Sequence, residues 1–264
     1  MFTSPGEIAF RVLNYPIHWY GIIMALSNLV GLSTIVAIQK KYYQNISKEF
    51  ILDLSFYLII AGILGARLYY VVLDYPYYSV HPKEILALWN GGLSIHGCIL
   101  LATLVCWIYV KIKKQNFLEV VDLYSYGLIL GQAVGRWGNF FNSEAFGSPT
   151  NLPWKLYIPL IDRPIELSSF QYFHPTFLYE SLINILIFLI LFFFVRKIST
   201  GKKGIVFCSY LILYSTGRLF IEGIRIDSIL DIGTIPIAQI ISIILIITGA
   251  IGIILINKKQ QVNN

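Results

Sequence analysis

The stretch IAQIISIILIITGAIGIILI, residues 237–256, contains no charged residue and is long enough to cross a bilayer as a helix. A spanning helix needs about 20 mostly apolar residues to cross about 30 Å of hydrocarbon. Comparable runs occur along the rest of the chain, at residues 17–38, 51–73, 92–112, 118–136, 176–195 and 204–222. The sequence therefore predicts an all-α membrane protein, a polytopic bundle of about seven transmembrane helices.

The overall composition excludes most other classes of protein. Hydrophobic residues make up 56% of the 264 residues and charged residues 13%, and the mean hydropathy is +0.69. A soluble domain carries about 25% charged residues, so a soluble enzyme is excluded. A disordered chain is excluded as well, because disorder requires few apolar residues and a high net charge. The three cysteines argue against a disulfide scaffold. The spacing of His, Cys, Asp and Glu matches no metal site, so we expect neither a metal nor a cofactor.

Basic residues predict the orientation of the chain in the membrane. They gather on alternate connections, which the positive-inside rule assigns to the cytoplasm; these are Lys40, Lys41, Lys48, Lys111, Lys113, Lys114, Arg196, Lys197, Lys202, Lys203, Lys258 and Lys259. We attribute the net charge of +6 to these connections and expect no nucleic-acid partner. The N-terminus is then outside and the C-terminus in the cytoplasm. We expect one integral membrane domain, residues 1–264, with an outward-facing loop or subdomain at about residues 137–173.

Polar residues within the apolar runs are candidates for function. Arg67, Arg136 and Arg218 each lie toward the predicted outer end of a span. An arginine in the membrane costs a few kcal/mol on insertion scales and usually has a function. A structural role is the alternative, because arginines near helix ends reach toward the headgroups. It is favoured for Arg67, which has only Leu, Tyr and Tyr directly after it. Other polar residues open spans on the same side, namely His18, Trp19, Tyr20, His96 and His174.

Small residues in the spans are expected to serve packing. Glycines at positions 127, 131 and 135 fall on one helix face, which lets helices pack closely in lipid, and packing alone is favoured for Gly127 and Gly131. Gly62 and Gly65 have the same interpretation. The three cysteines, Cys98, Cys106 and Cys208, are expected to be small core residues.

The densest polar pattern is GRWGNFFNSEAFG, residues 135–147. It places an arginine, two asparagines and a glutamate where a span is predicted to end. The planar fork of an arginine binds phosphate oxygens in a bidentate manner. Asparagine and glutamate supply donors and acceptors for hydroxyl groups. The stretch is therefore suited to hold an anion together with a set of hydroxyls.

Over nearly its whole length the sequence resembles the bacterial prolipoprotein diacylglyceryl transferases. Residues 135–147 match the family signature G-R-x-G-N-F-x-N-x-E-x-x-G at every fixed position. Four further stretches resemble family motifs: HWYG (18–21), GGLSIHG (91–97), HPT with LYE (174–176 and 178–180), and GRLFIE with Arg225 (217–222). Two departures are Cys98, where the family usually has glycine, and Phe177, where it often has glutamine.

The resemblance implies a reaction and a location. The enzyme would transfer the diacylglyceryl group of phosphatidylglycerol to the thiol of the lipobox cysteine in a preprolipoprotein signal peptide. The products would be a thioether-linked lipid and glycerol 1-phosphate, in the first step of bacterial lipoprotein maturation. The protein would be a multi-pass protein of the bacterial plasma (inner) membrane, in contact with membrane lipids, with its active site facing the outer leaflet.

We assign substrate-binding roles to five residues of these motifs. Arg136 and Arg218 are expected to bind the phosphate and to stabilise the charge on the leaving group. Asn139 and Tyr20 are expected to position the glycerol or the ester region. Gly147 would allow the backbone to approach the lipid headgroup closely.

The general base that removes the thiol proton has three candidates. The thiolate is the nucleophile, and a free cysteine has a pKa near 8.5. His96 is the first candidate, because the pKa of an unperturbed histidine lies near the working pH. It could instead be a hydrogen-bonding wall residue in a tight, glycine-rich turn. Glu144 and Glu222 are the rivals, and Glu222, four residues after Arg218, could instead only orient that arginine.

Two other classes of protein share some of these features. An anion transporter or channel would also carry arginines in the membrane. Its drawback is that the cytoplasmic halves of the spans consist mainly of Ile, Leu, Phe and Val, which leaves no polar path. A membrane scaffold would use the same residues only to bind lipid headgroups. The five motifs in order favour the transferase over both.

Overall fold

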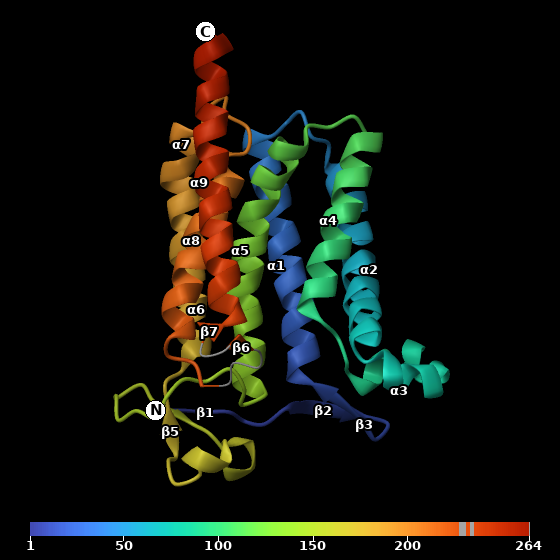
Figure 1. The fold of residues 1–264 in the computed structure, drawn as a ribbon, viewed down its shortest axis with the longest axis vertical. Coiled ribbons are helices and arrows are strands. Elements are labelled where there is room, and N and C mark those ends of the chain that lie inside the picture. The colour runs from blue at the N-terminus through green and yellow to red at the C-terminus, as the bar shows by residue number, and fades with distance from the viewer. Residues whose placement is uncertain (227–230, 233–234, 264) are drawn as a thin grey trace. The chain divides into compact units, whose positions relative to one another are not determined.

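The protein was analysed as a computed structural model, which describes residues 1–226, 231–232 and 235–263. Among these residues, seven helical segments are long and apolar enough to cross a membrane, which confirms the predicted number of spans (Figure 1). They are α1 (Trp19–Tyr42), α2 (Lys48–Leu73), α4 (Ile95–Ile112), α5 (Phe117–Phe141), the continuous run of α6 (Thr176–Ile190), the π-helical η5 (Leu191–Val195) and α7 (Arg196–Ile198), then α8 (Ile205–Glu222) and α9 (Ile237–Asn263).

Short elements connect the long helices. Three short strands form one sheet in the order β1-β4-β5, in which β1 and β4 are parallel and β4 and β5 antiparallel. Two further strand pairs, β2–β3 and β6–β7, are antiparallel hairpins. The bounds are β1 (Phe2–Thr3), β2 (Ile8–Val12), β3 (Tyr15–His18), α3 (Tyr75–Val80), η1 (Pro82–Leu86), η2 (Leu88–Asn90), β4 (Leu156–Tyr157), η3 (Leu160–Asp162), η4 (Ile165–Leu167), β5 (Tyr172–Phe173), β6 (Asp231–Ile232) and β7 (Ile235–Pro236).

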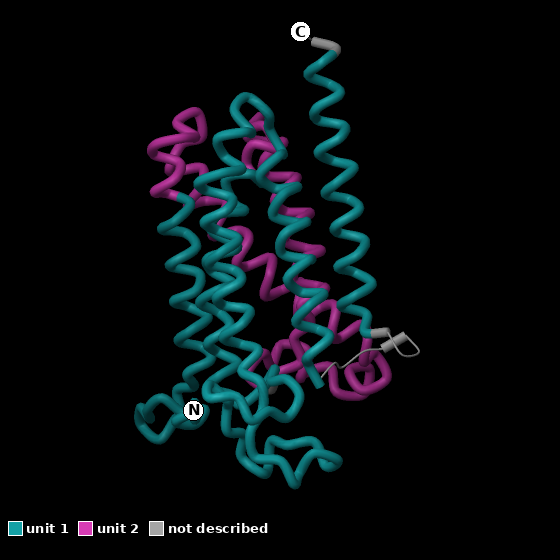
Figure 2. The backbone as a smooth tube through the Cα atoms, turned by 90° about the vertical axis from the view of Figure 1, so that its left-hand side faces the viewer, with its two compact units in different colours: residues 1–35, 121–264 teal, residues 36–120 magenta. Residues whose placement is uncertain are grey.

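The chain divides into two compact units (Figure 2). Unit 1 comprises residues 1–35 and 121–264, and unit 2 comprises residues 36–120. Unit 1 therefore contains most of α1 and α5, all of α6, α8 and α9, and the small sheet. Unit 2 contains α2, α3 and α4. Each unit is described by itself.

Side-chain caps explain where α2 and α5 begin. The hydroxyl of Ser47 accepts a hydrogen bond from the amide of Phe50 at 3.1 Å, which caps α2. Asn116 caps α5 in the same way, because its Oδ1 accepts from the amide of Glu119 at 3.1 Å. The polar stretch between residues 112 and 117 thus separates two spans that nearly adjoin in sequence.

Helix α5 ends later than expected. It continues to Phe141, whereas the sequence predicted an end at residue 136. Tertiary contacts hold the last turn, because the rings of Trp137 and Phe140 pack on Phe177 with centroids 5.4 and 4.9 Å away. Packing of this kind overrides local helix propensity. Arg136 and Asn139 therefore project from a helix rather than from the start of a loop.

In unit 1, glycines let α1 and α5 approach closely, as predicted. A Cβ atom added to Gly127 would lie 2.5 Å from the carbonyl oxygen of Gly31, and one added to Gly131 would lie 3.2 Å from that of Ser27. The hydroxyl of Ser27 also donates to the carbonyl of Gly131 at 2.7 Å. In unit 2 the same device joins α2 and α4, where Gly65 faces Gly97.

This contact gives a stability prediction with an internal control. We expect Gly127→Ala to lower the free energy of unfolding by about 1–3 kcal/mol, because the new methyl group meets backbone that cannot move aside. Gly135→Ala, on the same helix face, should be neutral or stabilising, since its Cβ would lie 3.6 Å from the nearest atom. Unfolding in mixed micelles measures both, and equal losses would contradict the close approach.

A carboxylate of α5 caps the first turn of α8. Asp122 is 3% exposed, and its two oxygens accept hydrogen bonds from the amides of Gly204 at 2.5 Å and Phe207 at 2.7 Å. A helix start has amide groups without partners inside the helix, and a negative charge is favourable there. The contact therefore fixes the beginning of α8 against α5.

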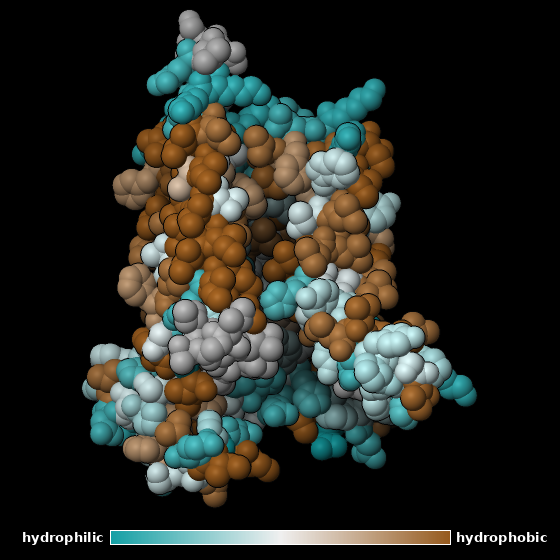
Figure 3. Space-filling view, in the orientation of Figure 1, coloured by the Kyte–Doolittle hydropathy of each residue, from teal (hydrophilic) through white to brown (hydrophobic). Residues whose placement is uncertain are grey.

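Helix α9 is attached to unit 1 on one side only. Gly249 and Gly252 pack on Cys208 of α8, and this thiol is a small core group, as expected. The three cysteines are free thiols. Other residues of α9, such as Ile244, Ile247 and Leu255, are more than half exposed. Figure 3 shows hydrophobic side chains along this region and hydrophilic ones at the C-terminal end, as a lipid-facing helix requires.

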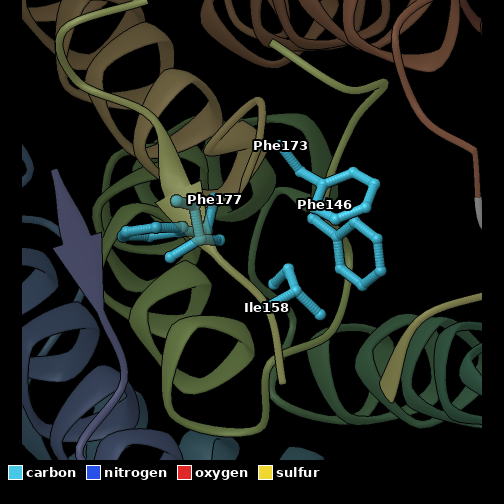
Figure 4. Close-up of a cluster of buried hydrophobic side chains, with 5 residues drawn as sticks. Phe146, Ile158, Phe173 and Phe177 are labelled. Carbon is cyan, nitrogen blue, oxygen red and sulfur yellow. The ribbon is translucent and has the colours of Figure 1, made fainter. Parts of the chain in front are cut away.

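An aromatic core supports the small sheet of unit 1. The side chains of Phe146, Ile158, Phe173 and Phe177 are at most 4% exposed, together with Leu156 (Figure 4). The rings of Phe146 and Phe173 lie 4.9 Å apart. Because Phe177 belongs to α6, this core ties the segment after α5 to the start of α6.

Candidate active site

Four charged side chains from three helices of unit 1 meet in one cluster. Glu180 of α6 pairs with Arg136 of α5 through Nε, and with Arg218 of α8 through Nη1 at 2.7 Å. The other edge of Arg218 pairs with Glu222, whose Oε2 lies 2.6 Å from Nη2. The expected neighbourhood of Arg218 and Glu222, four residues apart on one helix, is therefore present. We call these four residues the ion-pair cluster.

The ion-pair cluster is largely buried and formally neutral. The side chains of Arg136 and Arg218 are 22% and 17% exposed, and those of Glu180 and Glu222 are 8% and 3% exposed. Two guanidinium groups face two carboxylates, so the charges balance. Charged groups at this depth are costly unless they are paired. The arginines are thus held in fixed positions rather than free to move to the headgroups.

Packing between the three helices brings the ion-pair cluster together. The hydroxyl of Ser181, next to Glu180, donates to the carbonyl of Ala133 on α5 at 2.8 Å. It also accepts a hydrogen bond from Trp137 Nε1 at 3.3 Å. On the other side, Gly217 of α8 leaves room for Ile183 of α6. A Cβ added to Gly217 would lie 2.9 Å from Cγ2 of Ile183. Helix α6 is thereby fixed between α5 and α8.

Glu180 is the site residue that the sequence did not single out. It stood in the stretch LYE, but no role was assigned to it. A carboxylate in an apolar run is itself a functional signal, and its burial at 6% exposure beside two arginines makes it the centre of the cluster. Tyr214 was also missed, and it lies close enough to Arg136 to interact with it electrostatically.

A second polar group lies at the end of α5. Asn139 donates through Nδ2 to Oε1 of Glu144 at 2.8 Å, and the amide of Glu144 donates to the carbonyl of Asn139 at 3.1 Å. Glu144 itself is exposed and stands between Ser143 and Ala145, which have φ angles of 52° and 55°. Non-glycine residues rarely adopt this left-handed conformation, which occurs at functional sites.

Tyr20 joins the two polar groups. Its ring packs on α5, where a Cβ added to Gly138 would lie 3.0 Å from Cδ2 of the tyrosine. The hydroxyl is close enough to interact electrostatically with both Glu144 and Arg136. Three of the predicted binding residues, Tyr20, Arg136 and Asn139, therefore lie on one end of the α1–α5 pair in unit 1.

Gly147 has a packing reason to be glycine. A Cβ there would lie 2.8 to 3.0 Å from Ile224, His174 and Thr176. Its amide donates to the carbonyl of His174 at 2.9 Å, and it forms a β-bridge with Arg225. Protein atoms thus surround Gly147, which is sufficient to explain the residue type, and its approach to a lipid headgroup stays a prediction.

A small pocket between α6 and α8 adjoins the ion-pair cluster. Its cavity volume is about 10 Å³, and it is lined by Glu180, Ile183, Asn184, Tyr214, Gly217, Arg218 and Ile221. Asn184 is 3% exposed, and its Nδ2 has no hydrogen-bond partner among the described residues. The pocket therefore offers a buried donor next to two charged groups, in a space of about the size of one water molecule.

A further polar pair links α5 and α8 away from the ion-pair cluster. Gln132 of α5 donates to the hydroxyl of Tyr210 on α8 at 3.1 Å, and Tyr210 is 7% exposed. Tyr210 lies near the start of α8, far along the helix from Arg218. The sequence argument overlooked these residues because single polar groups in a span are hidden when they bond to each other across helices.

His96 belongs to unit 2. It lies half-buried in the first turn of α4, and its ring centroid is 6.1 Å from that of Tyr69. Its role as the general base stays a prediction.

Comparison with known proteins identifies the family. A sequence model described as prolipoprotein diacylglyceryl transferase matches residues 7–255. The chain belongs to this family. The resemblance inferred from the five motifs is confirmed, and the chain is a transferase of the diacylglyceryl transferase family.

Individual relatives of this diacylglyceryl transferase match over nearly its whole length. The phosphatidylglycerol–prolipoprotein diacylglyceryl transferase of Trichormus variabilis is 46% identical over 96% of this chain and 90% of its own. That of Synechocystis sp. is 44% identical over 98% and 92% of the two chains. That of Gloeobacter violaceus is 40% identical over 98% and 96%.

The ion-pair cluster of the diacylglyceryl transferase draws on three of the motifs. Arg136 comes from the stretch 135–147, Glu180 from the stretch 174–180, and Arg218 with Glu222 from the stretch 217–222. Segments that are far apart in sequence thus meet in one arrangement of charges.

Proposed function

We propose that the chain transfers the diacylglyceryl group of phosphatidylglycerol to the thiol of a lipobox cysteine in a preprolipoprotein. The names of the relatives give the lipid and the protein substrate. In the reaction a C–S bond forms between the cysteine sulfur and a glycerol carbon, and the bond from that carbon to the phosphate oxygen breaks. The bonding electrons leave with glycerol 1-phosphate, and the thiol proton passes to a base.

The observation that carries this function is the ion-pair cluster. The two recorded pairs of Arg218 use two of the five N–H donors of a guanidinium, so donors remain for a phosphate oxygen. The carboxylates hold both arginines before the lipid arrives, which removes the need to reorganise charges during the reaction. The polar group of Asn139 and Glu144 supplies partners for the glycerol hydroxyls.

The contacts support different roles for the three candidate bases. The side chain of Glu222 is 3% exposed and paired with Arg218, which supports an orienting role rather than proton abstraction. Glu144 is exposed and keeps one carboxylate oxygen beyond its bond to Asn139. His96 remains the first candidate, because an imidazole accepts a proton near neutral pH.

The proposed site faces the outer leaflet of the bacterial inner membrane. In unit 1 the N-terminal strand and the C-terminal end of α9 lie at opposite ends of the helices (Figure 1). The basic residues Arg196, Lys197, Lys202 and Lys203 lie between α6 and α8, at the end away from the ion-pair cluster. The positive-inside rule assigns that end to the cytoplasm, which supports an outer position for the cluster.

Mass spectrometry of the acceptor tests the function. We expect the purified protein in proteoliposomes with phosphatidylglycerol to add a diacylglyceryl mass to the cysteine of a synthetic lipobox peptide, and to release glycerol 1-phosphate. A peptide with Cys→Ser and the variant Arg136→Ala should give no product. Arg11→Ala, in the exposed β2–β3 hairpin, is the matched control and should stay active. Folded protein that gives no mass shift would contradict the proposal, and solute flux through the same vesicles would then test the transporter alternative.

A further inference from the structure

Arg67 of α2 has its whole hydrogen-bonding capacity engaged by backbone. The residue is 4% exposed, and the ring of Tyr78 covers its guanidinium at 5.1 Å. Its nitrogens donate hydrogen bonds to five backbone carbonyl oxygens. Nε donates to Ile85 at 2.8 Å, and Nη1 donates to Gly91 at 2.7 Å and Gly92 at 3.1 Å. Nη2 donates to Glu84 at 2.5 Å and Ala87 at 3.4 Å.

The number of contacts matches the chemistry of arginine. A guanidinium has five N–H donors in a rigid fork, whereas an ammonium has three. The accepting carbonyls belong to η1, to Ala87 between η1 and η2, and to the two glycines that follow η2. This segment has few backbone hydrogen bonds of its own. Buried carbonyls need partners. Arg67 supplies such partners to residues 84–92, in addition to the backbone hydrogen bonds of η1 and η2.

The segment held by Arg67 leads directly into the helix that carries His96. Gly91 and Gly92 have φ angles of 80° and 70°, and a Cβ added to Gly92 would lie 2.7 Å from Nη1 of Arg67. Two residues further on, the amide of Ser94 donates to the carbonyl of Ala66 at 3.0 Å. Helix α4 starts at Ile95, so His96 follows at once.

We propose that Arg67 is a positioning residue that sets the place of His96. Its guanidinium fixes the backbone of residues 84–92 on α2, and this anchor determines where α4 begins and where the imidazole stands. The catalytic consequence rests on the proposed function, because it requires His96 to act in the transfer. The positional consequence does not, since it concerns unit 2 alone.

Histidine NMR tests the positional part without any activity. The full-length protein has four histidines, which can be labelled in the ring and assigned with His96→Gln. In Arg67→Lys we expect the ring signals of His96 to shift or broaden, while those of His18 and His174 in unit 1 stay unchanged. Gly92→Ala, which disturbs the same contact from the other side, should do the same. His96 signals that match those of the unchanged protein in both variants would overturn the proposal.

A double-mutant cycle tests the catalytic part. Single-turnover rates with phosphatidylglycerol and lipobox peptide are expected to fall at least about tenfold in Arg67→Lys, as displacement of a reacting group does. In a His96→Gln background the same change should cost nothing further, whereas equal losses in both backgrounds would refute action through His96. Arg163→Lys is the matched control, because Arg163 also donates to loop carbonyls, those of Ile158 and Ser168, but in unit 1.

The two tests also distinguish this proposal from the function on which it rests. If the unchanged protein forms no thioether, the proposed function fails, and the histidine signals still decide whether Arg67 positions His96. If the protein is active and the His96 signals do not respond to either variant, the positioning role fails alone.

Discussion

Arg136→Lys is expected to lose nearly as much activity as Arg136→Ala, on the order of 10²–10³-fold in kcat. Lysine keeps the positive charge but lacks the planar fork. Arg136 pairs with Glu180 through Nε and lies close to Tyr214. A phosphate would need a further edge of the same guanidinium group. The single ammonium group of a lysine cannot contact Glu180, Tyr214 and a phosphate at the same time.

The comparison of the two variants requires saturating phosphatidylglycerol, so that a change in lipid affinity does not hide a change in kcat. The thioether product on the lipobox peptide is the measured quantity. Arg11→Lys on the exposed hairpin is the control for loss of an arginine elsewhere in unit 1 and should retain full rates. Full activity in Arg136→Lys would exclude bidentate binding by this residue.

Glu180→Gln is expected to damage both the stability and the activity of the protein. The change keeps the shape of the side chain but removes the charge that Arg136 and Arg218 share. Removal of one partner from a buried ion pair costs about 3–5 kcal/mol, because the other charge is left without compensation. The arginines should also lose their fixed geometry, so kcat should fall together with stability.

Two measurements separate these effects in Glu180→Gln. Unfolding by SDS in mixed micelles gives the loss of stability, and the rate at a temperature where the variant remains folded gives the loss of catalysis. Glu166→Gln, in the exposed turn η4, is the matched control and should change neither quantity. Wild-type values for Glu180→Gln in both measurements would show that the carboxylate is dispensable.

The transmembrane spans were predictable because hydrophobic length is a local property. Each run could be recognised from about 20 consecutive residues, without knowledge of its neighbours. The end of α5 was not predictable in this way. Its last turn depends on Phe177, which packs on Phe140 but lies 37 residues later in the chain. The orientation of the spans and the single-domain organisation remain predictions.

The site was predictable only where partners share a helix. Arg218 and Glu222 are four residues apart, so the spacing alone placed them together. Glu180 meets Arg136 and Arg218 across helices, and spacing within one helix contains no information about such contacts. Arg67 was the extreme case. Its partners are backbone carbonyls, 17 to 25 residues away. Every residue has a backbone carbonyl, so the sequence does not show which of them accept a hydrogen bond from Arg67.

The cap that Asp122 provides has a consequence for the biogenesis of the protein. The amides of Gly204 and Phe207 receive their acceptor from a residue 82 positions or more earlier. Amide groups without an acceptor are costly in hydrocarbon. Because the ribosome delivers α5 before α8, the acceptor is already in the membrane when the start of α8 leaves the translocation machinery. A circular permutation that placed α8 ahead of α5 would reverse this order of synthesis. The amides at the start of α8 would then enter the membrane before Asp122, their acceptor, has been made.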